Sequence, residues 1–351
     1  MPCPLQRSEK GMGEEQDQSR TLRVRVNMRS KVINTMKKTR VCFVLLATFL
    51  PAISAYAQSE LNLSGVIDMR AHSGPDSVPR AIDADDLARL AKKQGMRGVV
   101  LKSHWDSTAA LAYEVSKQVP GVEVYGGIVL DKSVGGINLE AVKRMAMMKG
   151  GLGRVVWLPT EDSEVTVKAH EAGALPPTSA DKSPLPVVKV SENGHLLPSV
   201  LELIDYMAKH PELVLETGHI SGAEALMVIH EAHERGVKHI VATGPYDRIV
   251  NMSIPQMQQA AREGAYIEFA YNNTLGAHRH RTMSEFAEAI RKIGPEFCIL
   301  SSDFGSVHGD YPMHPQAMLD FMTALRKEGF SVADINRMAK TNPALAMGLK
   351  P

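Results

Sequence analysis

Two early segments of the sequence end in polar side chains of the kinds that bind metal ions or move protons. The segment "VIDMRAHSGPD", residues 66–76, is apolar at its start and then presents Arg70 and His72. Side chains two residues apart in a strand point to the same face, so these two are expected to lie together. A second segment, "LKSHW", presents Lys102 and His104 with the same spacing. Because imidazole is both a metal ligand and a base near neutral pH, the pattern predicts metal binding or proton transfer.

Later apolar runs end in residues of the same types. Each has an ordinary structural explanation, since a lone histidine at a strand end is more often a hydrogen-bonded structural residue than a ligand. Glu268, between apolar neighbours, can face solvent, and "SSDFG" can be a turn. The set is more informative than any member, because imidazole or carboxylate recurs after several runs. The further candidates are Asp68, Thr160, Glu161, Glu216, His219, Thr243, Tyr246, Glu268, Asp303 and His308.

Eight short apolar runs alternate with helical patterns along the chain. One such pattern, residues 83–95, begins at an aspartate suited to capping and ends at Gly95. This alternation predicts an α/β fold with a parallel sheet, and the count of eight predicts a (β/α)8 TIM barrel. An open doubly wound sheet is the alternative, although no G-x-G-x-x-G follows the first strand. The expected strands are 63–69, 97–103, 122–130, 154–159, 212–218, 239–244, 266–271 and 297–303.

The connection after the fourth expected strand is unusually long. Residues 160–197 contain a proline-rich middle and include His170. A connection of this length is typical of a lid or binding loop, so we expect a lid-like insertion. Its end is expected to form a hairpin that turns at Asn193 and Gly194. The last helical pattern, residues 331–349, is expected to pack outside the barrel.

The first 57 residues have the character of a leader. Lys37 and Lys38 precede an apolar stretch too short to span a bilayer, and an A-x-A pattern ends at Ala57. We expect cleavage after Ala57, secretion or periplasmic export, and a single domain over 58–351 with a formal charge near −5. No stretch is basic and aromatic enough for nucleic acid, and nothing after the leader predicts a membrane span. Cys298, the last of three cysteines, is expected to be a buried apolar residue.

The ordered motifs resemble the amidohydrolase superfamily of metal-dependent hydrolases, and within it a bacterial group of amidohydrolase-like proteins. The matching pieces are "DMRAHSGPDSVPR", "LKSHW", "GGIVLDKSVGGINLEAV", "VVWLPT", "LETGHIS" and "SSDFG". The resemblance implies a (β/α)8 barrel with one divalent metal ion, Zn²⁺ first and Mn²⁺ or Fe²⁺ as alternatives, beside a small-molecule substrate. It implies metal ligands His72, His104, His219 and Asp303, catalytic roles for Asp303 as general base and for Lys102, and substrate contacts from Arg70, Glu268, Tyr246 and His170.

This sequence departs from the superfamily pattern in three places. Arg70 stands where the first histidine of a His-x-His pair is expected, and Thr243-Gly244 stands where many members supply a histidine. No lysine suited to carbamylation follows the fourth strand. A two-metal site is therefore not expected. Arg70 would instead place a fixed positive charge beside one metal and favour an anionic substrate group.

These observations predict a periplasmic hydrolase of a small anionic amide, ester or lactone. Two alternatives stay open: a lyase or decarboxylase on the same barrel, and a degenerate barrel that binds a small ligand without chemistry. Whether the chain forms a homo-oligomer is left open by the sequence.

Overall fold

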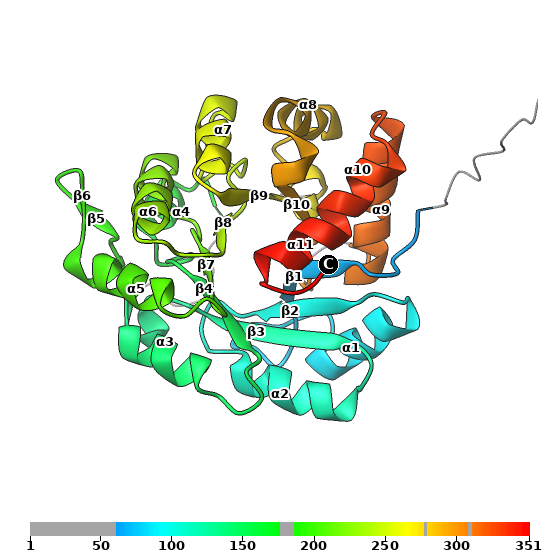
Figure 1. The fold of residues 1–351 in the computed structure, drawn as a ribbon, viewed down its shortest axis with the longest axis horizontal. Helices are drawn as coiled ribbons and strands as arrows, with labels where there is room; N and C mark the ends of the chain where they lie inside the picture. Colours follow the sequence, from blue (N-terminus) through cyan, green and yellow to red (C-terminus); the bar gives the residue numbers. More distant parts are fainter. Residues whose placement is uncertain (1–60, 176–185, 277–278, 308–310) are drawn as a thin grey trace, which may run out of the picture. The chain divides into compact units, whose positions relative to one another are not determined.

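Eight parallel strands form the centre of the fold. The computed structural model describes residues 61–175, 186–276, 279–307 and 311–351, so the leader lies outside the described residues. The sheet order follows the chain, and all neighbouring strands pair in parallel. All eight expected strands are confirmed (Figure 1). They are β1 (Ile67–His72), β2 (Gly98–Lys102), β3 (Glu123–Val129), β4 (Gly153–Trp157), β7 (Val214–Glu216), β8 (Ile240–Ala242), β9 (Ala265–Ala270) and β10 (Cys298–Ser301).

The first and last strands approach each other at their carboxyl ends. Ala71 forms a parallel bridge with Phe304, and the His72 amide donates a hydrogen bond to the Phe304 carbonyl at 3.0 Å. The Asp303 amide likewise donates to the Arg70 carbonyl at 2.9 Å. The sheet is therefore a nearly closed, TIM-barrel-like barrel, and the open-sheet alternative is wrong.

Helices surround the strands as an outer ring (Figure 1). The expected helix at 83–95 is present as α1, with Asp83 at its N-cap position. Helix α6 begins with a capping box in which Ser221 and Glu224 satisfy each other's backbone amides. The ring contains α1 (Ala84–Lys93), α2 (Ala109–Gln118), α3 (Leu139–Ala146), α5 (Pro198–Ala208), α6 (Gly222–Glu234), α7 (Ile254–Arg262), α8 (Met283–Ile293) and α9 (His314–Lys327).

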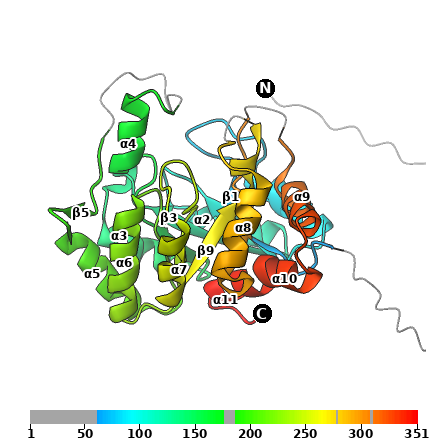
Figure 2. The same ribbon diagram turned by 90° about the horizontal axis from the view of Figure 1, so that it is seen from above.

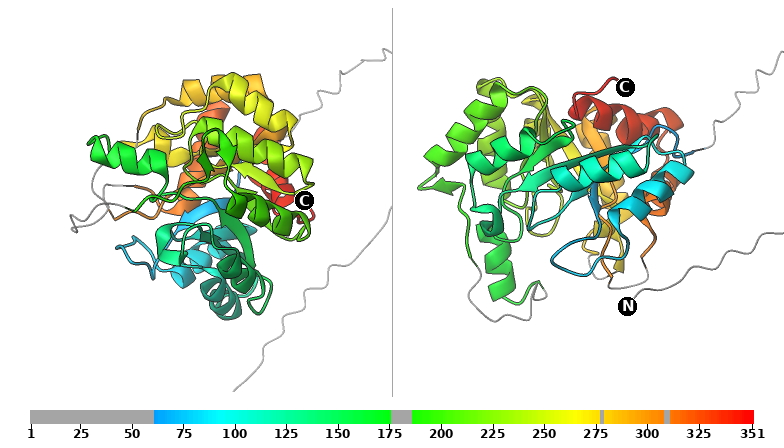
Figure 3. Two further views of the ribbon diagram at one scale, coloured as in Figure 1. Left: turned by 90° about the vertical axis from the view of Figure 1, so that its left-hand side faces the viewer. Right: turned by 90° about the horizontal axis from the view of Figure 1, so that it is seen from below.

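The connection after β4 contains more regular structure than expected. Helix α4 (Glu164–Glu171) forms there because the Ser163 hydroxyl accepts a hydrogen bond from the Thr166 amide and caps the helix. Helix α4 stands beyond the ring, at the end of the barrel opposite the C-terminal helices (Figures 2 and 3). The hairpin is confirmed as β5 (Ser191–Glu192) and β6 (His195–Leu196), with positive φ at both turn residues. The middle of the connection, 176–185, lies outside the described residues, so a lid remains a prediction.

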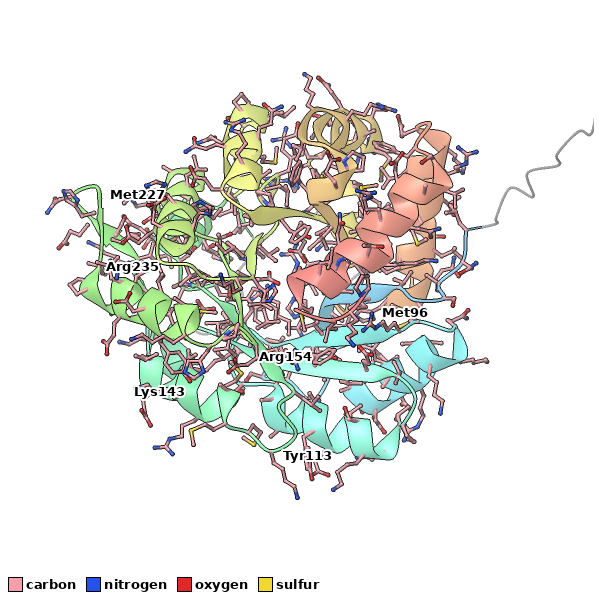
Figure 4. The ribbon with its side chains drawn as sticks, in the orientation of Figure 1. Met96, Tyr113, Lys143, Arg154, Met227 and Arg235 are labelled. Atoms are coloured by element: carbon pink, nitrogen blue, oxygen red, sulfur yellow. The ribbon has the colours of Figure 1, made fainter. Side chains whose placement is uncertain are left out.

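The C-terminal segment closes the other end of the barrel rather than packing only on the outside. Helix α10 (Val332–Asn336), the π-helical turn η5 (Arg337–Thr341) and helix α11 (Asn342–Ala346) follow one another. Ala346 and Met347 pack against inward apolar residues of the strands, including Ile67 and Trp157. Arg154 lies near the centre of the view in Figure 4, and its guanidinium donates to the Met347 carbonyl at 3.3 Å.

The core is otherwise as expected for an α/β protein. Cys298 is fully buried, as predicted. Within the described ranges, no helix combines the length and the apolar character that a membrane span requires.

Candidate functional site

A bulge in β1 turns its polar residues into the barrel. Asp68 pairs with Val99 and Ala71 with Leu101, so β1 carries one more residue than β2 between these pairs. Ala71 then faces the helices with Leu101, while Arg70 and His72 face inward. The Asp68 carboxylate accepts hydrogen bonds from the backbone amide and hydroxyl of Ser302, which joins β1 to the end of β10. The inward arrangement of Arg70 and His72 agrees with the spacing in the sequence.

A polar layer lies above the apolar interior, at the carboxyl ends of the strands. Its members are fully or almost fully buried. Glu268 belongs to this layer, so the interpretation of Glu268 as a solvent-facing residue is wrong. The layer contains Arg70, His72, Lys102, Glu216, Thr243, Glu268 and Ser301.

Arg70 is the central cation of this layer. Its Nε lies 3.4 Å from Glu268 Oε2 and 3.4 Å from Asp303 Oδ1. Burial opposes its charged form, but the neighbouring carboxylates of Asp303 and Glu268 outweigh this and raise the pKa of Arg70. Arginine stays protonated in proteins in any case, so the barrel holds a permanent positive charge here.

Asp303 is held as an anion by these neighbours. Burial favours its neutral form, but Arg70 and His72 outweigh this and lower the pKa of Asp303 well below its usual range. Its Oδ1 lies 3.3 Å from His72 Nε2, and its Oδ2 accepts a hydrogen bond from Asn272 at 2.9 Å. Asp303 also has a positive φ of 56°, which fixes its backbone in the left-handed region. A carboxylate with such a low pKa is a weak base at neutral pH.

Three histidines lie beside the Arg70–Asp303 pair. The ring centroids of His72 and His104 are 4.9 Å apart, and those of His104 and His219 are 5.9 Å apart. Burial lowers the pKa of all three, to about 4 for His72. All three are therefore neutral at pH 7, and each has one ring nitrogen with a lone pair.

His104 is also tied to a buried carboxylate through a threonine. His104 Nδ1 lies 2.7 Å from the Thr160 hydroxyl, which donates to Asp131 Oδ2 at 2.6 Å. On its other side, His104 Nε2 lies 3.9 Å from Glu161 Oε1. Glu161 Oε2 in turn lies 3.6 Å from His170 Nε2, which brings the predicted substrate residue His170 next to the site from α4.

Lys102 and Glu216 complete the layer. Lys102 Nζ is buried 5.7 Å from the centroid of the Trp157 ring, with no hydrogen-bond partner among the described residues. Burial and the charge of Arg70 lower the pKa of Lys102. Glu216 Oε2 accepts hydrogen bonds from Trp157 Nε1 at 2.7 Å and the Thr243 hydroxyl at 2.9 Å, and burial raises the pKa of Glu216 to about 8.

Tyr246 is placed differently from the other predicted residues. Its ring packs against Phe269 and Phe286, with centroids 6.4 Å and 6.0 Å away. The Arg281 guanidinium lies 4.1 Å above the same ring. These contacts make Tyr246 part of the aromatic packing, and its role in binding substrate remains a prediction. His308 lies outside the described residues.

Two further residues of the site were not singled out from the sequence. Asp131 lies two residues after the end of β3, so the rule that selects residues at strand ends could have identified it. Asp247 lies in the loop after β8, and burial raises its pKa to about 7. It accepts a hydrogen bond from Asn273 and adds negative charge near Arg70. No pattern in the sequence distinguishes it from an ordinary loop aspartate.

The donor types suit a metal ion, but their arrangement does not. Neutral imidazoles and an ionised carboxylate are ligands that Zn²⁺ accepts. Across the part of the chain that the structure describes, however, no group of three or more His, Cys, Asp or Glu is placed to hold a metal ion. Asp303 Oδ1 instead faces Arg70 and His72. The present arrangement of side chains does not fit the metal that the resemblance implies, so we assign no chemical step to one.

The fold and the rim cluster define a class: a TIM-barrel-like α/β protein with a buried, charged cluster at the carboxyl ends of its strands. The chain belongs to the family of unknown function DUF6282, whose model matches residues 65–268. No curated protein matches the sequence.

Solved structures share the fold at low sequence identity. An organophosphorus hydrolase from Deinococcus radiodurans is 14% identical with a TM-score of 0.55, covering 81% of this chain and 92% of that chain. An amidohydrolase from Pseudomonas aeruginosa is 12% identical with a TM-score of 0.55, covering 81% and 95%. An organophosphate-hydrolysing enzyme engineered from a promiscuous lactonase is 14% identical with a TM-score of 0.54, covering 82% and 97%. The resemblance to amidohydrolases is thus confirmed at the level of the fold.

A buried histidine behind the site gives a prediction for stability. His314 Nε2 lies 2.8 Å from the Phe304 carbonyl, and burial lowers its pKa from 6.5 to about 4. Between these values the unfolded chain binds a proton that the folded chain does not, so stability falls as pH drops from 6.5 to 4. We expect His314→Gln, which keeps a donor, to remove about 3 kcal/mol of this acid-induced loss. Urea unfolding of both proteins at pH 7.5 and 4.5 measures it.

The exposed His195 is replaced by glutamine in parallel, as a control for the substitution itself. The explanation fails if wild type and His314→Gln lose the same free energy of unfolding between the two pH values.

Proposed function

We propose that the protein is a hydrolase of a small anionic ester, lactone or amide. The observation that carries the proposal is Arg70, a fully buried guanidinium at the carboxyl ends of the strands, where sites form in this type of barrel. Lys102 lies on the neighbouring strand and pairs in register with His72. Two cationic side chains on adjacent strands suit a carboxylate or phosphonate group of a substrate.

The neutral histidines supply the base that hydrolysis needs. Asp303 is poorly suited to take a proton from water, because its ion pair with Arg70 keeps its pKa low. His72 contacts Asp303, His104 stacks on His72, and His219 lies beside His104. All three imidazoles retain a lone pair when neutral. We therefore assign charge balance and orientation to Asp303, and proton transfer to a histidine.

A binding protein without catalysis is the second candidate. The same observation supports it, because Arg70 replaces an expected metal-binding histidine and forms ion pairs with Glu268 and Asp303. In this case anions would bind to the site without turnover. We also propose that the protein acts outside the cytoplasm, on the evidence of its leader-like N-terminal sequence.

A panel of substrates tests the proposal on the full-length chain after export. Aryl esters, lactones and N-acyl amino acids are each assayed with and without a carboxylate group, in chelator and in added Zn²⁺ or Mn²⁺. We expect turnover of at least one carboxylate-bearing compound. Lys102→Met should bind that compound more weakly, by about 10-fold or more as judged by KM, because one cation is lost. Lys117→Met, on the exposed face of α2, is the matched control.

The outcomes separate the two candidates. Stabilisation by the carboxylate compounds without turnover in any condition supports the binding protein. If the compounds are neither hydrolysed nor stabilise the protein, both the hydrolase and the binding protein are contradicted.

A further inference from the structure

We propose that Asp131 and Thr160 fix His104 as the tautomer with hydrogen on Nδ1, so that the bare Nε2 is the base that accepts a proton from the attacking water. The catalytic half of this inference rests on the proposed hydrolase function, whereas the tautomer does not. Asp131 and Thr160 are positioning residues, because they act through His104.

The assignment follows from counting hydrogens along the chain of contacts. The Thr160 hydroxyl has one hydrogen, and Asp131 Oδ2 lies 2.6 Å away to accept it. The 2.7 Å contact between Thr160 Oγ1 and His104 Nδ1 must then use a hydrogen from the ring. A neutral imidazole has a single ring hydrogen, so in His104 that hydrogen is on Nδ1 and Nε2 has a lone pair.

The direction of the chain depends on Asp131 being ionised. Burial raises the pKa of Asp131 to about 7. A protonated Asp131 would donate to Thr160, and Thr160 would then donate to His104, which reverses the direction of both hydrogen bonds. Three backbone amides also donate to its oxygens, those of Thr160 at 2.7 Å, Glu161 at 3.1 Å and Asp162 at 3.2 Å. Hydrogen bonds of this kind favour the carboxylate. Above pH 8 the ionised form and the stated direction therefore hold.

The bare nitrogen faces a second acceptor. Glu161 Oε1 lies 3.9 Å from His104 Nε2, so two acceptors flank one position. A water molecule has two hydrogens and can donate one to each. In hydrolysis, its oxygen bonds to the carbonyl carbon while its proton moves to Nε2. The bond from that carbon to the leaving oxygen or nitrogen then breaks, and the proton on Nε2 passes to the leaving atom.

Nitrogen NMR tests the tautomer directly. Long-range ¹H–¹⁵N spectra of the full-length protein, labelled in histidine, are recorded at pH 8.5, and His104→Gln identifies the His104 signals. We expect a pyrrole-like shift for Nδ1 and a pyridine-like shift for Nε2. Thr160→Ser should keep this pattern. Thr160→Val removes the acceptor and should move the population towards the Nε2–H tautomer.

Controls and activity complete the test. Thr323→Val removes a hydroxyl on α9 that donates to the Leu319 carbonyl of the same helix, and it should change nothing at His104. We expect Thr160→Val to lower kcat by about 10-fold or more, with Thr160→Ser near wild type, since a positioned base contributes about 100-fold or more. An Nε2–H tautomer in the wild type, or no change in Thr160→Val, overturns the inference. A confirmed tautomer without turnover of any substrate refutes only the hydrolase.

Discussion

Replacing Arg70 by methionine is expected to lower the free energy of unfolding by about 3–5 kcal/mol. Arg70 Nε lies 3.4 Å from carboxylate oxygens of both Glu268 and Asp303, and its side chain is fully buried. Methionine fills a similar volume but leaves the fully buried Glu268 and the largely buried Asp303 without their counter-charge. Urea unfolding at pH 8 measures the loss.

A surface arginine provides the comparison. Arg89 pairs with Asp85 and Asp86 but its side chain is 51% exposed, so Arg89→Met should destabilise the protein much less than Arg70→Met. Adding Asp303→Asn to Arg70→Met should recover part of the loss, because it removes one of the unpaired charges. A loss below about 1 kcal/mol in Arg70→Met would contradict the central role of this cation.

The strands and the rim were predictable because they depend on local patterns. Each β-branched run could be recognised in isolation, and parallel strands bring their carboxyl ends to one rim. That Arg70 and His72 share one face followed from their spacing. The bulge beside Asp68 was not predictable, because it appears only in the register of β1 against β2.

The sequence was least informative where contacts between residues far apart in the chain determine the structure. Residues 331–349 read as an ordinary amphipathic helix, but Met347 is buried against the interior of the barrel. The sequence left open whether Glu268 faces solvent or the site, because its partner, Arg70, is nearly 200 residues away in the sequence. The hydrogen-bonded link between His104 and Asp131 likewise depends on Thr160, which follows β4 and contacts both residues.

The structure links two of the departures from the superfamily pattern to each other. Gly244 has a φ of 46°, and a Cβ atom built on it would lie 3.1 Å from Arg70 Nη2 and 2.4 Å from Asp247 Oδ2. The guanidinium of Arg70 thus occupies space beside the position where a side chain at 244 would begin. The two substitutions are therefore compatible with each other, whereas an arginine at 70 beside a histidine at 244 would be crowded.

We therefore expect Gly244→His alone to destabilise the protein by about 2 kcal/mol or more, and Arg70→His to relieve part of this cost in the double variant. The crowding around Asp247 Oδ2 remains in the double variant, so the rescue should be incomplete. Urea unfolding of both single variants and the double variant gives the coupling energy, and additive effects would contradict the steric link.

The same double variant tests what the permanent charge does to metal binding. Arg70 places a cation against Asp303, which disfavours a divalent ion at that carboxylate. Arg70→His/Gly244→His removes the charge and adds two imidazoles, so we expect it to bind about one more Zn²⁺ per chain than wild type. Metal content after dialysis against Zn²⁺ is measured by plasma mass spectrometry, with Asp303→Ala added to the double variant to show whether the gained ion uses that carboxylate. Two ions per wild-type chain would show that Arg70 does not exclude a second cation.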